Sequence, residues 1–255
     1  MAELKTEMKA YWDAHPIGVE GISEPMESAA FYDQYLTYYD DFYDYKAKTF
    51  EYEKYKGLRV LEIGCGLGID SVKFAKAGAK LTCIDLSDTS VKSTRRLLDR
   101  FGLRAEVSQG DAENLNFPSE SFDAVYSYGV LMLVDDEQRA VDEVHRVLKP
   151  GGKALVVLYH RRSWYWLLVK LTGTKVESEH GDPPINRVHS IRQVRDLFSR
   201  FSEVQIELER FPKRTRRRRG ALALLFNWVL VPLSRMTPKP LIRPFGWHIV
   251  IKAIK

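Results

Sequence analysis

The stretch Arg59-Val-Leu-Glu-Ile-Gly-Cys-Gly-Leu-Gly-Ile-Asp70 decides the fold of this chain. Its first half is a short apolar run that is typical of a buried parallel strand. Glycines follow at positions 64, 66 and 68, and residues 71–77 then have the apolar spacing of a helix. A strand, a glycine turn and a helix in this order let backbone amides approach a nucleotide-like ligand.

The spacing of these glycines separates two classes of nucleotide site. A dinucleotide fingerprint has the pattern G-x-G-x-x-G and would need a third glycine at position 69. The chain has Ile69 there and instead reads G-x-G-x-G, with the acid Glu62 just before the turn. The sequence therefore lacks the dinucleotide fingerprint.

This turn resembles motif I of the class I S-adenosylmethionine (SAM) dependent methyltransferases, and four further motifs follow in the family's order. A second apolar run ends at Asp85, 19 residues after the second glycine, and Gly110-Asp111-Ala112-Glu113 follows a third. Residues 122–127 are similar to the family's fourth strand, and residues 148–152 to the turn before its fifth. The resemblance covers residues 57–158 and is to the small-molecule type, similar to methyltransferase domains 11 and 25.

The resemblance implies an α/β, Rossmann-like class I methyltransferase fold. Its seven-stranded sheet is expected to be mostly parallel, with an antiparallel last strand and helices on both faces. Residues 1–56 are expected to form an N-terminal lid or helical segment, and residues 57–255 the SAM-binding domain. Acceptor-site insertions are expected at 159–200 and 211–246, the second of them a long insertion between strands six and seven.

The resemblance also implies SAM as the methyl donor and S-adenosylhomocysteine as the product. Asp85 has the spacing of an acid that hydrogen-bonds ribose hydroxyls, and family members hold the adenine amino group with the residue at the position of Asp111. The expected cofactor-binding residues are Glu62, Gly64, Cys65, Gly66, Gly68, Asp85, Leu86, Asp111, Ala112, Glu113 and Ser127.

Apolar periodicity and capping residues predict the remaining elements. Helices are predicted over 69–77, 87–101, 136–147, 163–173 and 190–200, and later strands over 153–158, 204–208 and 247–254. Residues 1–30 are expected to be irregular and to carry Tyr11, Trp12 and His15. This segment is either part of a lid over the cofactor or a surface strap held by its aromatic residues.

Residues 31–55 hold eight of the thirteen tyrosines. A single helical stripe is predicted here, because aromatic residues recur at helical spacing at Phe31, Tyr35, Tyr38, Phe42 and Tyr45. The stripe either packs on the domain or lines the acceptor pocket. Tyrosine suits such a pocket because its apolar ring ends in a polar hydroxyl.

The chain departs from the family after the fourth strand, where many relatives have a histidine pair. It has Met132 and Leu133 there, so a general base is not expected at that point and the acceptor pocket is expected to be apolar. The catalytic candidates are His160, Tyr128 and Tyr159, which follow the ends of the fourth and fifth strands. The acceptor-pocket candidates are Tyr11, Trp12, His15, Tyr35, Met132 and His180.

Length and composition suit one α/β domain with added segments, since the 255 residues are 45% hydrophobic. The two cysteines, Cys65 and Cys83, form no CxxC pair, and no metal-ligand spacing is visible, so no metal is expected. The few cysteines indicate a reducing compartment. The N-terminus lacks the apolar core of a signal peptide, and no apolar run reaches about 18 residues. These features predict a cytoplasmic protein.

The net charge of +5 is unevenly distributed. Residues 210–255 hold twelve Lys or Arg and no acid, which leaves 27 basic against 34 acidic residues in the rest of the chain. The basic run Lys213–Arg219 and the apolar run 221–231 fit a peripheral contact with an anionic membrane or an anionic acceptor. The alternative is a helix packed on the body beside a solvated basic linker. Nucleic acid is less favoured, because no RNA-binding module is recognisable.

Together these features predict a SAM-dependent methyltransferase that acts on a small molecule. A hydrophobic, prenyl or lipid-like acceptor is favoured, because aromatic residues are plentiful at 31–55 and 164–166. Two alternatives remain open. One is an RNA or protein methyltransferase that uses the basic segment, and the other is a non-catalytic SAM-fold module that binds a membrane or a partner.

Overall fold

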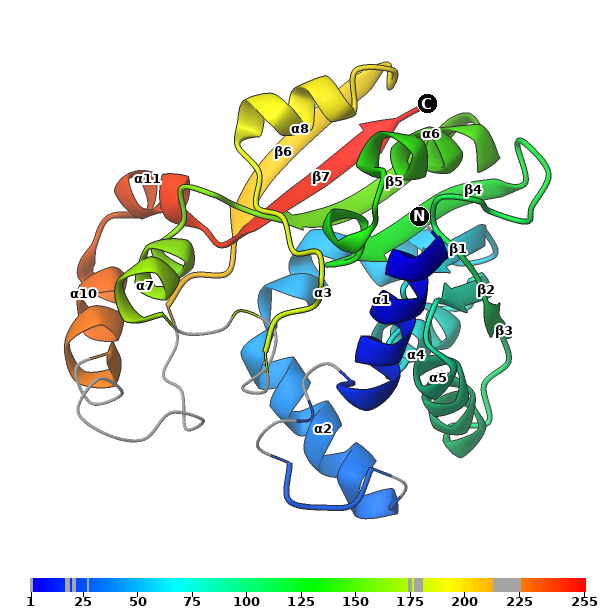
Figure 1. The fold of residues 1–255 in the computed structure, drawn as a ribbon, viewed down its shortest axis with the longest axis horizontal. Coiled ribbons are helices and arrows are strands. Elements are labelled where there is room, and N and C mark those ends of the chain that lie inside the picture. The colour runs from blue at the N-terminus through cyan, green and yellow to red at the C-terminus, as the bar shows by residue number, and fades with distance from the viewer. Residues whose placement is uncertain are drawn as a thin grey trace.

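The computed structural model of the chain describes residues 2–16, 19, 22–26, 28–173, 176, 181–212 and 226–255. Its strands are β1 (Arg59–Ile63), β2 (Lys80–Asp85), β3 (Glu106–Gln109), β4 (Phe122–Tyr128), β5 (Leu148–Tyr159), β6 (Glu203–Glu209) and β7 (His248–Ile254). They form one seven-stranded sheet in the order β3-β2-β1-β4-β5-β7-β6 (Figure 1). β7 is antiparallel to both of its neighbours, and all other pairs are parallel. The predicted fold class is confirmed.

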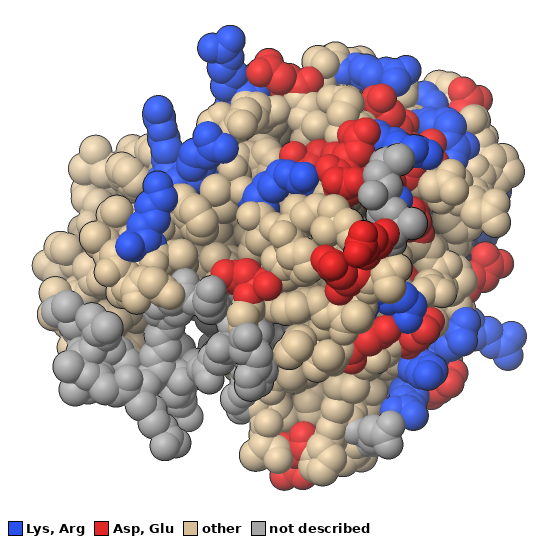
Figure 2. All heavy atoms as spheres, in the orientation of Figure 1, with Lys and Arg blue, Asp and Glu red and all other residues tan. Residues whose placement is uncertain are grey.

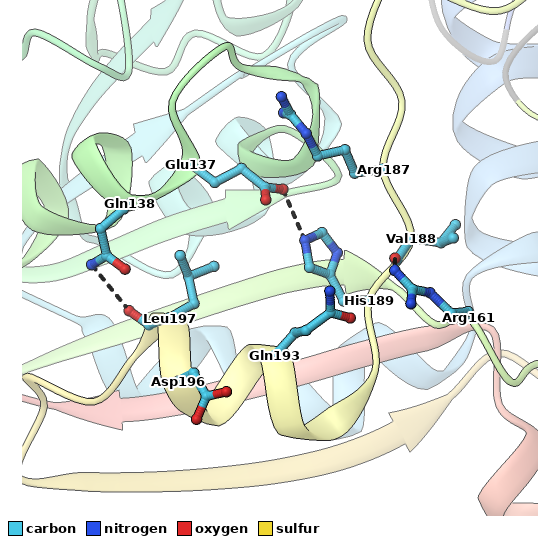
Figure 3. Close-up of a pocket in the computed structure, with 9 residues that line it drawn as sticks. All are labelled: Glu137, Gln138, Arg161, Arg187, Val188, His189, Gln193, Asp196 and Leu197. Carbon is cyan, nitrogen blue, oxygen red and sulfur yellow. Dashed lines mark hydrogen bonds and ion pairs between the residues drawn. The ribbon is translucent and has the colours of Figure 1, made fainter.

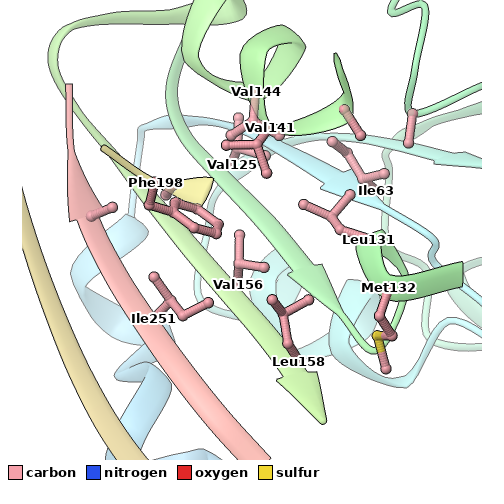
Figure 4. Packing of buried hydrophobic residues seen from close by; sticks show 14 of the residues in the cluster. Ile63, Val125, Leu131, Met132, Val141, Val144, Val156, Leu158, Phe198 and Ile251 are labelled. Carbon is pink, nitrogen blue, oxygen red and sulfur yellow. The ribbon is translucent and has the colours of Figure 1, made fainter. Parts of the chain in front are cut away.

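Each face of the sheet has its own buried core, because successive residues of a strand point to opposite faces. In β4, Val125 belongs to the core shown in Figure 4, whereas Ala124 and Tyr126 belong to the core of the other face. In β5, Val156 and Val157 are divided in the same way. Strands that are covered on both faces appear in the sequence as continuous apolar runs, which explains why they could be predicted.

Helices cover both faces of the sheet (Figure 1). They are α1 (Ala2–Ala14), α2 (Ala29–Phe42), α3 (Tyr45–Phe50), α4 (Ile69–Lys76), α5 (Asp88–Arg100), α6 (Glu137–Val147), α7 (Trp164–Thr172), α8 (Ile191–Leu197), α10 (Val231–Met236) and α11 (Lys239–Ile242). Four further helical turns, which are 3₁₀ or π rather than α-helical, are η1 (Tyr52–Tyr55), η2 (Leu131–Leu133), η3 (Phe226–Leu230) and η4 (Arg243–Phe245). Side-chain caps start α5, α6, α7 and α8 at Ser87, Asp136, Ser163 and Ser190. The five helices predicted beyond residue 69 are therefore confirmed, within three residues at their ends.

The expectation that residues 1–30 are irregular was wrong for residues 2–14, which form α1. Leu4, Met8 and Trp12 recur every four residues and so share one side of the helix. Met8 is buried, and Trp12 packs against the same core. Burial of this narrow stripe stabilises a segment that otherwise has a polar composition.

The predicted stripe over 31–55 is divided among α2, α3 and η1. Phe31 and Tyr35 are buried in the second core, where their rings stack with centroids 5.7 Å apart. These two residues therefore pack on the domain, as the first of the two alternatives expected.

A buried ion pair joins this N-terminal region to the glycine turn. Lys46 of α3 is fully buried, and its Nζ lies 2.5 Å from Oδ2 of Asp70 in the first turn of α4. The hydroxyls of Tyr39, Tyr52 and Tyr126 also donate to the Asp70 carboxylate. Burial alone would raise the pKa of Asp70, but Lys46, the charge of Lys73 and the hydrogen bond from Tyr126 together hold that pKa below its usual value. Burial lowers the pKa of Lys46 to about 8.

The segment between β6 and β7 is long, as predicted. Its described parts are 210–212 and 226–247. The second part contains η3, α10, α11 and η4, which are kept short by prolines at positions 232, 238, 240 and 244. The basic run Lys213–Arg219 lies outside the described residues, as does the first half of the apolar run. No helix in the described ranges combines the length and the apolar character needed to cross a bilayer.

We expect Asp70→Asn to lower the free energy of unfolding by about 3–5 kcal/mol, because it leaves the Lys46 charge buried without its counter-ion. Urea unfolding monitored by circular dichroism measures the loss. The matched control is Asp33→Asn, which removes a largely exposed pair with Arg100 and should cost less than about 1 kcal/mol. Equal losses in the two variants would contradict the role of the buried pair.

Candidate active site

The glycine turn between β1 and α4 depends on backbone conformations that other residues rarely adopt. The φ angles of Gly64, Gly66 and Gly68 are 77°, 53° and 86°. A Cβ atom on Gly64 would also lie 2.1 Å from Cγ2 of Val130, in the loop after β4. Position 64 therefore requires glycine both for its conformation and for this close approach.

Asp85, the last residue of β2, holds the turn in place. Its Oδ2 accepts a hydrogen bond from the backbone N–H of Gly66 at 2.9 Å, and its Oδ1 accepts one from the backbone N–H of Ser87 at 2.9 Å. Burial raises the pKa of Asp85, and these two hydrogen bonds oppose the rise. Because Asp85 also lines the adjoining cavity, its remaining lone pairs can accept hydrogen bonds from a ligand.

Helix α1 covers the carboxyl ends of β2 and β3 through polar contacts. Lys5 Nζ lies 2.6 Å from Oδ2 of Asp111 and 3.0 Å from Oε2 of Glu113. Burial lowers the pKa of Lys5, but the two carboxylates outweigh it, and the pKa is raised. At the other end of α1, Asp13 accepts a hydrogen bond from Oγ of Ser87 at 2.7 Å. These contacts make α1 one wall of the cavity.

The glycine-turn cavity is enclosed by the turn after β1, the ends of β2, β3 and β4, and α1. Apolar side chains such as Ile84, Val130 and Leu133 alternate in its lining with carboxylates and glycine backbone. This mixture suits a nucleoside, which has flat apolar faces together with hydroxyl and amino donors. Seven of the expected cofactor-binding residues line it, namely Gly64, Gly66, Asp85, Leu86, Asp111, Ala112 and Glu113.

The other four expected cofactor-binding residues, Glu62, Cys65, Gly68 and Ser127, are not part of this lining. Glu62 is buried beneath the turn, where Oγ of Ser71 donates to it at 2.5 Å and burial raises its pKa to about 8. Ser127 is fully buried at the end of β4, and in the described part of the chain its Oγ has no hydrogen-bond partner. Ser127 is thus adjacent in sequence to Tyr128 of the cavity wall but does not itself line the cavity.

At Tyr128 the cavity wall meets a cluster of aromatic and charged side chains. Tyr128 Oη lies 2.8 Å from Oη of Tyr45 and 2.9 Å from Nδ1 of His248. Arg210 Nη1 lies 3.0 Å from Nε2 of His248. Because a guanidinium can only donate, Nε2 accepts, and Nδ1 therefore carries the imidazole proton and donates to the phenol oxygens. Burial and the Arg210 charge hold the pKa of His248 well below its usual value, which keeps this ring neutral.

The catalytic candidates occupy different places. Tyr128 lines the cavity, and Lys46 Nζ lies 3.4 Å from the centroid of its ring. Tyr159 lies outside the lining and stacks on Trp247, with ring centroids 4.4 Å apart. His160 is buried further from the cavity, where Nδ1 lies 3.0 Å from the carbonyl oxygen of Gly246 and burial lowers its pKa.

The acceptor-pocket candidates are dispersed. Trp12 lines the cavity. Tyr11 donates to the backbone carbonyl of residue 181 at 2.8 Å, and Nδ1 of His15 lies 3.0 Å from the carbonyl of Tyr11; neither residue lines the cavity. The remaining candidates are Tyr35 and Met132, which are buried in the two cores, and His180, which lies outside the described residues.

A second cavity lies beside α6 and α8 (Figure 3). In it, Oε1 of Glu137 lies 2.9 Å from Nε2 of His189, and the guanidinium of Arg187 donates to the carbonyls of residues 134 and 135. These contacts fix the segment before α8 to the loop after β4. Ile185 and Asp135 from the same two segments line the glycine-turn cavity, so this network shapes its wall.

The sequence reasoning missed two groups of residues at this site. Lys5 and Met8 line the cavity from α1, and the four-residue spacing of Leu4, Met8 and Trp12 was the available signal. Arg210 and His248 had no signal of their own. They come together because Glu209 and His248 are opposite each other in the β6–β7 ladder, a register that the sequence did not specify.

Comparisons with known proteins agree with this geometry. Residues 61–156 match a family described as a methyltransferase domain. Phosphatidylethanolamine N-methyltransferase from Cereibacter sphaeroides is 32% identical over 119 residues, which are 46% of this chain and 58% of that protein. Ubiquinone/menaquinone biosynthesis C-methyltransferase UbiE from Psychromonas ingrahamii is 36% identical over 107 residues, 40% of this chain and 43% of that protein. The chain thus spans about half the length of these two curated relatives.

Solved structures extend the likeness beyond the matched segment. Magnesium protoporphyrin IX methyltransferase from Synechocystis PCC 6803 superposes with a TM-score of 0.61 at 14% identity, over 98% of this chain and 99% of that one. At such low identity the likeness shows the fold. Residues 61–156 therefore match a methyltransferase-domain family, and the chain shares the fold of solved SAM-dependent methyltransferases.

We expect Gly64→Ala to destabilise the protein more than Gly57→Ala. Both glycines have φ near 76°, where a Cβ costs about 1–2 kcal/mol. At Gly57 no atom would lie within 4 Å of the new Cβ, whereas at Gly64 overpacking against Val130 adds about 1–3 kcal/mol. Urea unfolding measures both losses. Adding Val130→Ala to Gly64→Ala should recover part of the difference, and equal losses at the two glycines would contradict the close approach.

Proposed function

We propose that this chain transfers the methyl group of SAM to a small-molecule acceptor of hydrophobic character. The observation that carries the proposal is the glycine-turn cavity, in which Asp85 and Asp111 line one space together with the backbone of the turn. The same space reaches Tyr128 and its aromatic surroundings. In this proposal the part of the cavity that holds the nucleoside adjoins the part that holds the acceptor.

The cofactor half is assigned to the cavity-lining residues of the family motifs. The Asp85 carboxylate would accept hydrogen bonds from ribose hydroxyls, and Asp111 would accept one from the adenine amino group once Lys5 gives way. Glu62, Cys65, Gly68 and Ser127 support the turn and the adjoining strand end in this proposal. Bound SAM supplies a methyl group made electrophilic by its sulfonium.

On the acceptor side, alignment and the exclusion of water are what the chain has to provide. Tyr128 is the first candidate for the residue that orients the acceptor, because it lines the cavity and its hydroxyl is fixed by Tyr45 and His248. Tyr159 and His160 are assigned to the aromatic support behind it. The neutral His248, held by Arg210, is a donor rather than a base, so the site favours an acceptor that needs little help in losing a proton.

The hydrophobic character of the acceptor rests on the lining and on the relatives. Met8, Trp12, Val130 and Ile185 give the cavity an apolar wall. The names of the two curated relatives refer to phosphatidylethanolamine and to ubiquinone or menaquinone, which are lipids. In the same proposal residues 1–56 form the lid and helical segment, residues 57–255 form the methyltransferase domain, and the protein acts at the surface of a membrane.

We expect Asp85→Ala to weaken SAM binding by about 1.5–3 kcal/mol in isothermal titration, because a hydrogen bond to a charged group is lost. Asp99→Ala, an exposed position on α5, is the matched control and should bind SAM as the parent chain does. Asp85→Asn keeps one acceptor oxygen and should lose less. Since Asp85 also holds the turn, thermal unfolding of each variant is measured in parallel. Unchanged affinity in Asp85→Ala would contradict the assignment of the cofactor half.

A further inference from the structure

Exposed large apolar side chains gather in one region of the molecule. Of the ten such residues in the described ranges, nine lie on α7, η3, α10, α11 or η4, and the tenth is Leu58 just before β1. The exposed fractions are high, at 81% for Met236, 76% for Leu171 and 67% for Trp228. Single exposed apolar residues are ordinary on a protein surface, but a gathering of this kind marks an interaction site. We call it the apolar surface.

The charges on the apolar surface have one sign. Among the described side chains, the five elements that form it contain Lys170, Arg235 and Arg243 but neither Asp nor Glu. In Figure 2 the part of the visible face over α7, α10 and α11 is coloured tan and blue, whereas the red side chains gather further from it. Apolar side chains interspersed with basic ones complement a partner that has an apolar interior and an anionic surface.

The elements of the apolar surface are packed together and lie at the catalytic end of the sheet. The rings of Trp164 in α7 and Phe226 in η3 have centroids 5.6 Å apart, and Nε1 of Trp164 donates to the carbonyl of Arg210 at 2.9 Å. α7 follows the end of β5, and η3 to η4 lie between the end of β6 and the start of β7 (Figure 1). These are the strand ends that carry Tyr159, Arg210 and His248.

We propose that the apolar surface docks on an anionic lipid bilayer, with its apolar side chains among the acyl chains and its basic side chains at the headgroups. A second copy of the chain is a poorer occupant, because two such surfaces would bring like charges together without an acid between them. RNA is a poorer occupant because it would leave the apolar side chains in water. The docking itself is independent of the chemistry. The further inference that docking presents a lipid acceptor to the cavity rests on the proposed function.

The test is co-sedimentation of the full chain with vesicles of phosphatidylcholine alone and of phosphatidylcholine mixed with phosphatidylglycerol. We expect binding to the anionic vesicles that weakens as salt is raised, and much weaker binding to the neutral ones. Arg235→Gln and Arg243→Gln should each lower the affinity for anionic vesicles about fivefold, which corresponds to about 1 kcal/mol per basic residue near the surface.

Apolar contact is tested by the double variant Leu233→Glu with Met236→Glu, which we expect to lower vesicle affinity at least tenfold. Leu58→Glu is the control, because it places one new carboxylate at the exposed large apolar residue that, among the described residues, lies outside the apolar surface, and it should bind vesicles as the parent chain does. All of these positions are exposed, and thermal unfolding checks that each variant is folded.

Several results would overturn the proposal. They are no sedimentation with either vesicle, equal loss in the Leu58→Glu control, or a dimer in sedimentation equilibrium that the double variant dissociates while vesicles go unbound. Binding to RNA without binding to vesicles would overturn it as well. Titration of the chain with SAM tests the proposed function separately. If the chain binds vesicles but does not bind SAM, the proposed methyl transfer is contradicted and the proposed docking surface is still supported.

Discussion

The carboxylate of Asp70 is the interaction on which the rest of the structure depends. It lies in the first turn of α4, directly after the glycines, and receives hydrogen bonds from Lys46, Tyr52 and Tyr126 as well as Tyr39. These donors come from α2, α3, η1 and β4. One buried charge thus holds the N-terminal helices against the central strand and fixes the helix that begins at the turn. It also places Lys46 beneath the ring of Tyr128, so the same pair reaches the residue that we propose orients the acceptor.

The glycine turn then sets what the cavity can hold. Positive φ angles at three alternate positions bring the backbone against the loop after β4, and Asp85 fixes the turn from the neighbouring strand. Helix α1 lies across the opening, with Lys5 on Asp111 and Asp13 on Ser87. In the proposed function, entry of the nucleoside would compete with the contacts of Lys5, and α1 would be the part of the wall that yields. Below the turn, Glu62 is buried and accepts a hydrogen bond from Ser71.

Much of the fold could be predicted from the sequence because the signals are local. The parallel strands appear as apolar runs, because helices cover both faces of the sheet. Ser87 and Asp136 mark the starts of α5 and α6, since each side chain accepts a hydrogen bond from the first turn of its helix. α1 was missed because its apolar stripe is narrow and its stability comes from burial of Met8 in a distant core. The cluster of Tyr45, Tyr128, His248 and Arg210 could not be predicted at all. It joins residues up to 203 positions apart through a strand register that only the folded sheet defines.

The acceptor side combines a donor network with an apolar approach. Arg210 fixes the neutral form of His248, and His248 in turn fixes the phenols of Tyr45 and Tyr128. The elements from α7 to η4 extend this end of the sheet outward.

The proposed methyl transfer can be measured directly with SAM that is labelled in its methyl group. The purified chain is incubated with a lipid and small-molecule extract, and the label is then partitioned among organic, aqueous and macromolecular fractions. We expect label in the organic fraction with the parent chain and a strong reduction with Asp85→Ala. Absence of transfer, or label confined to macromolecules, would contradict it.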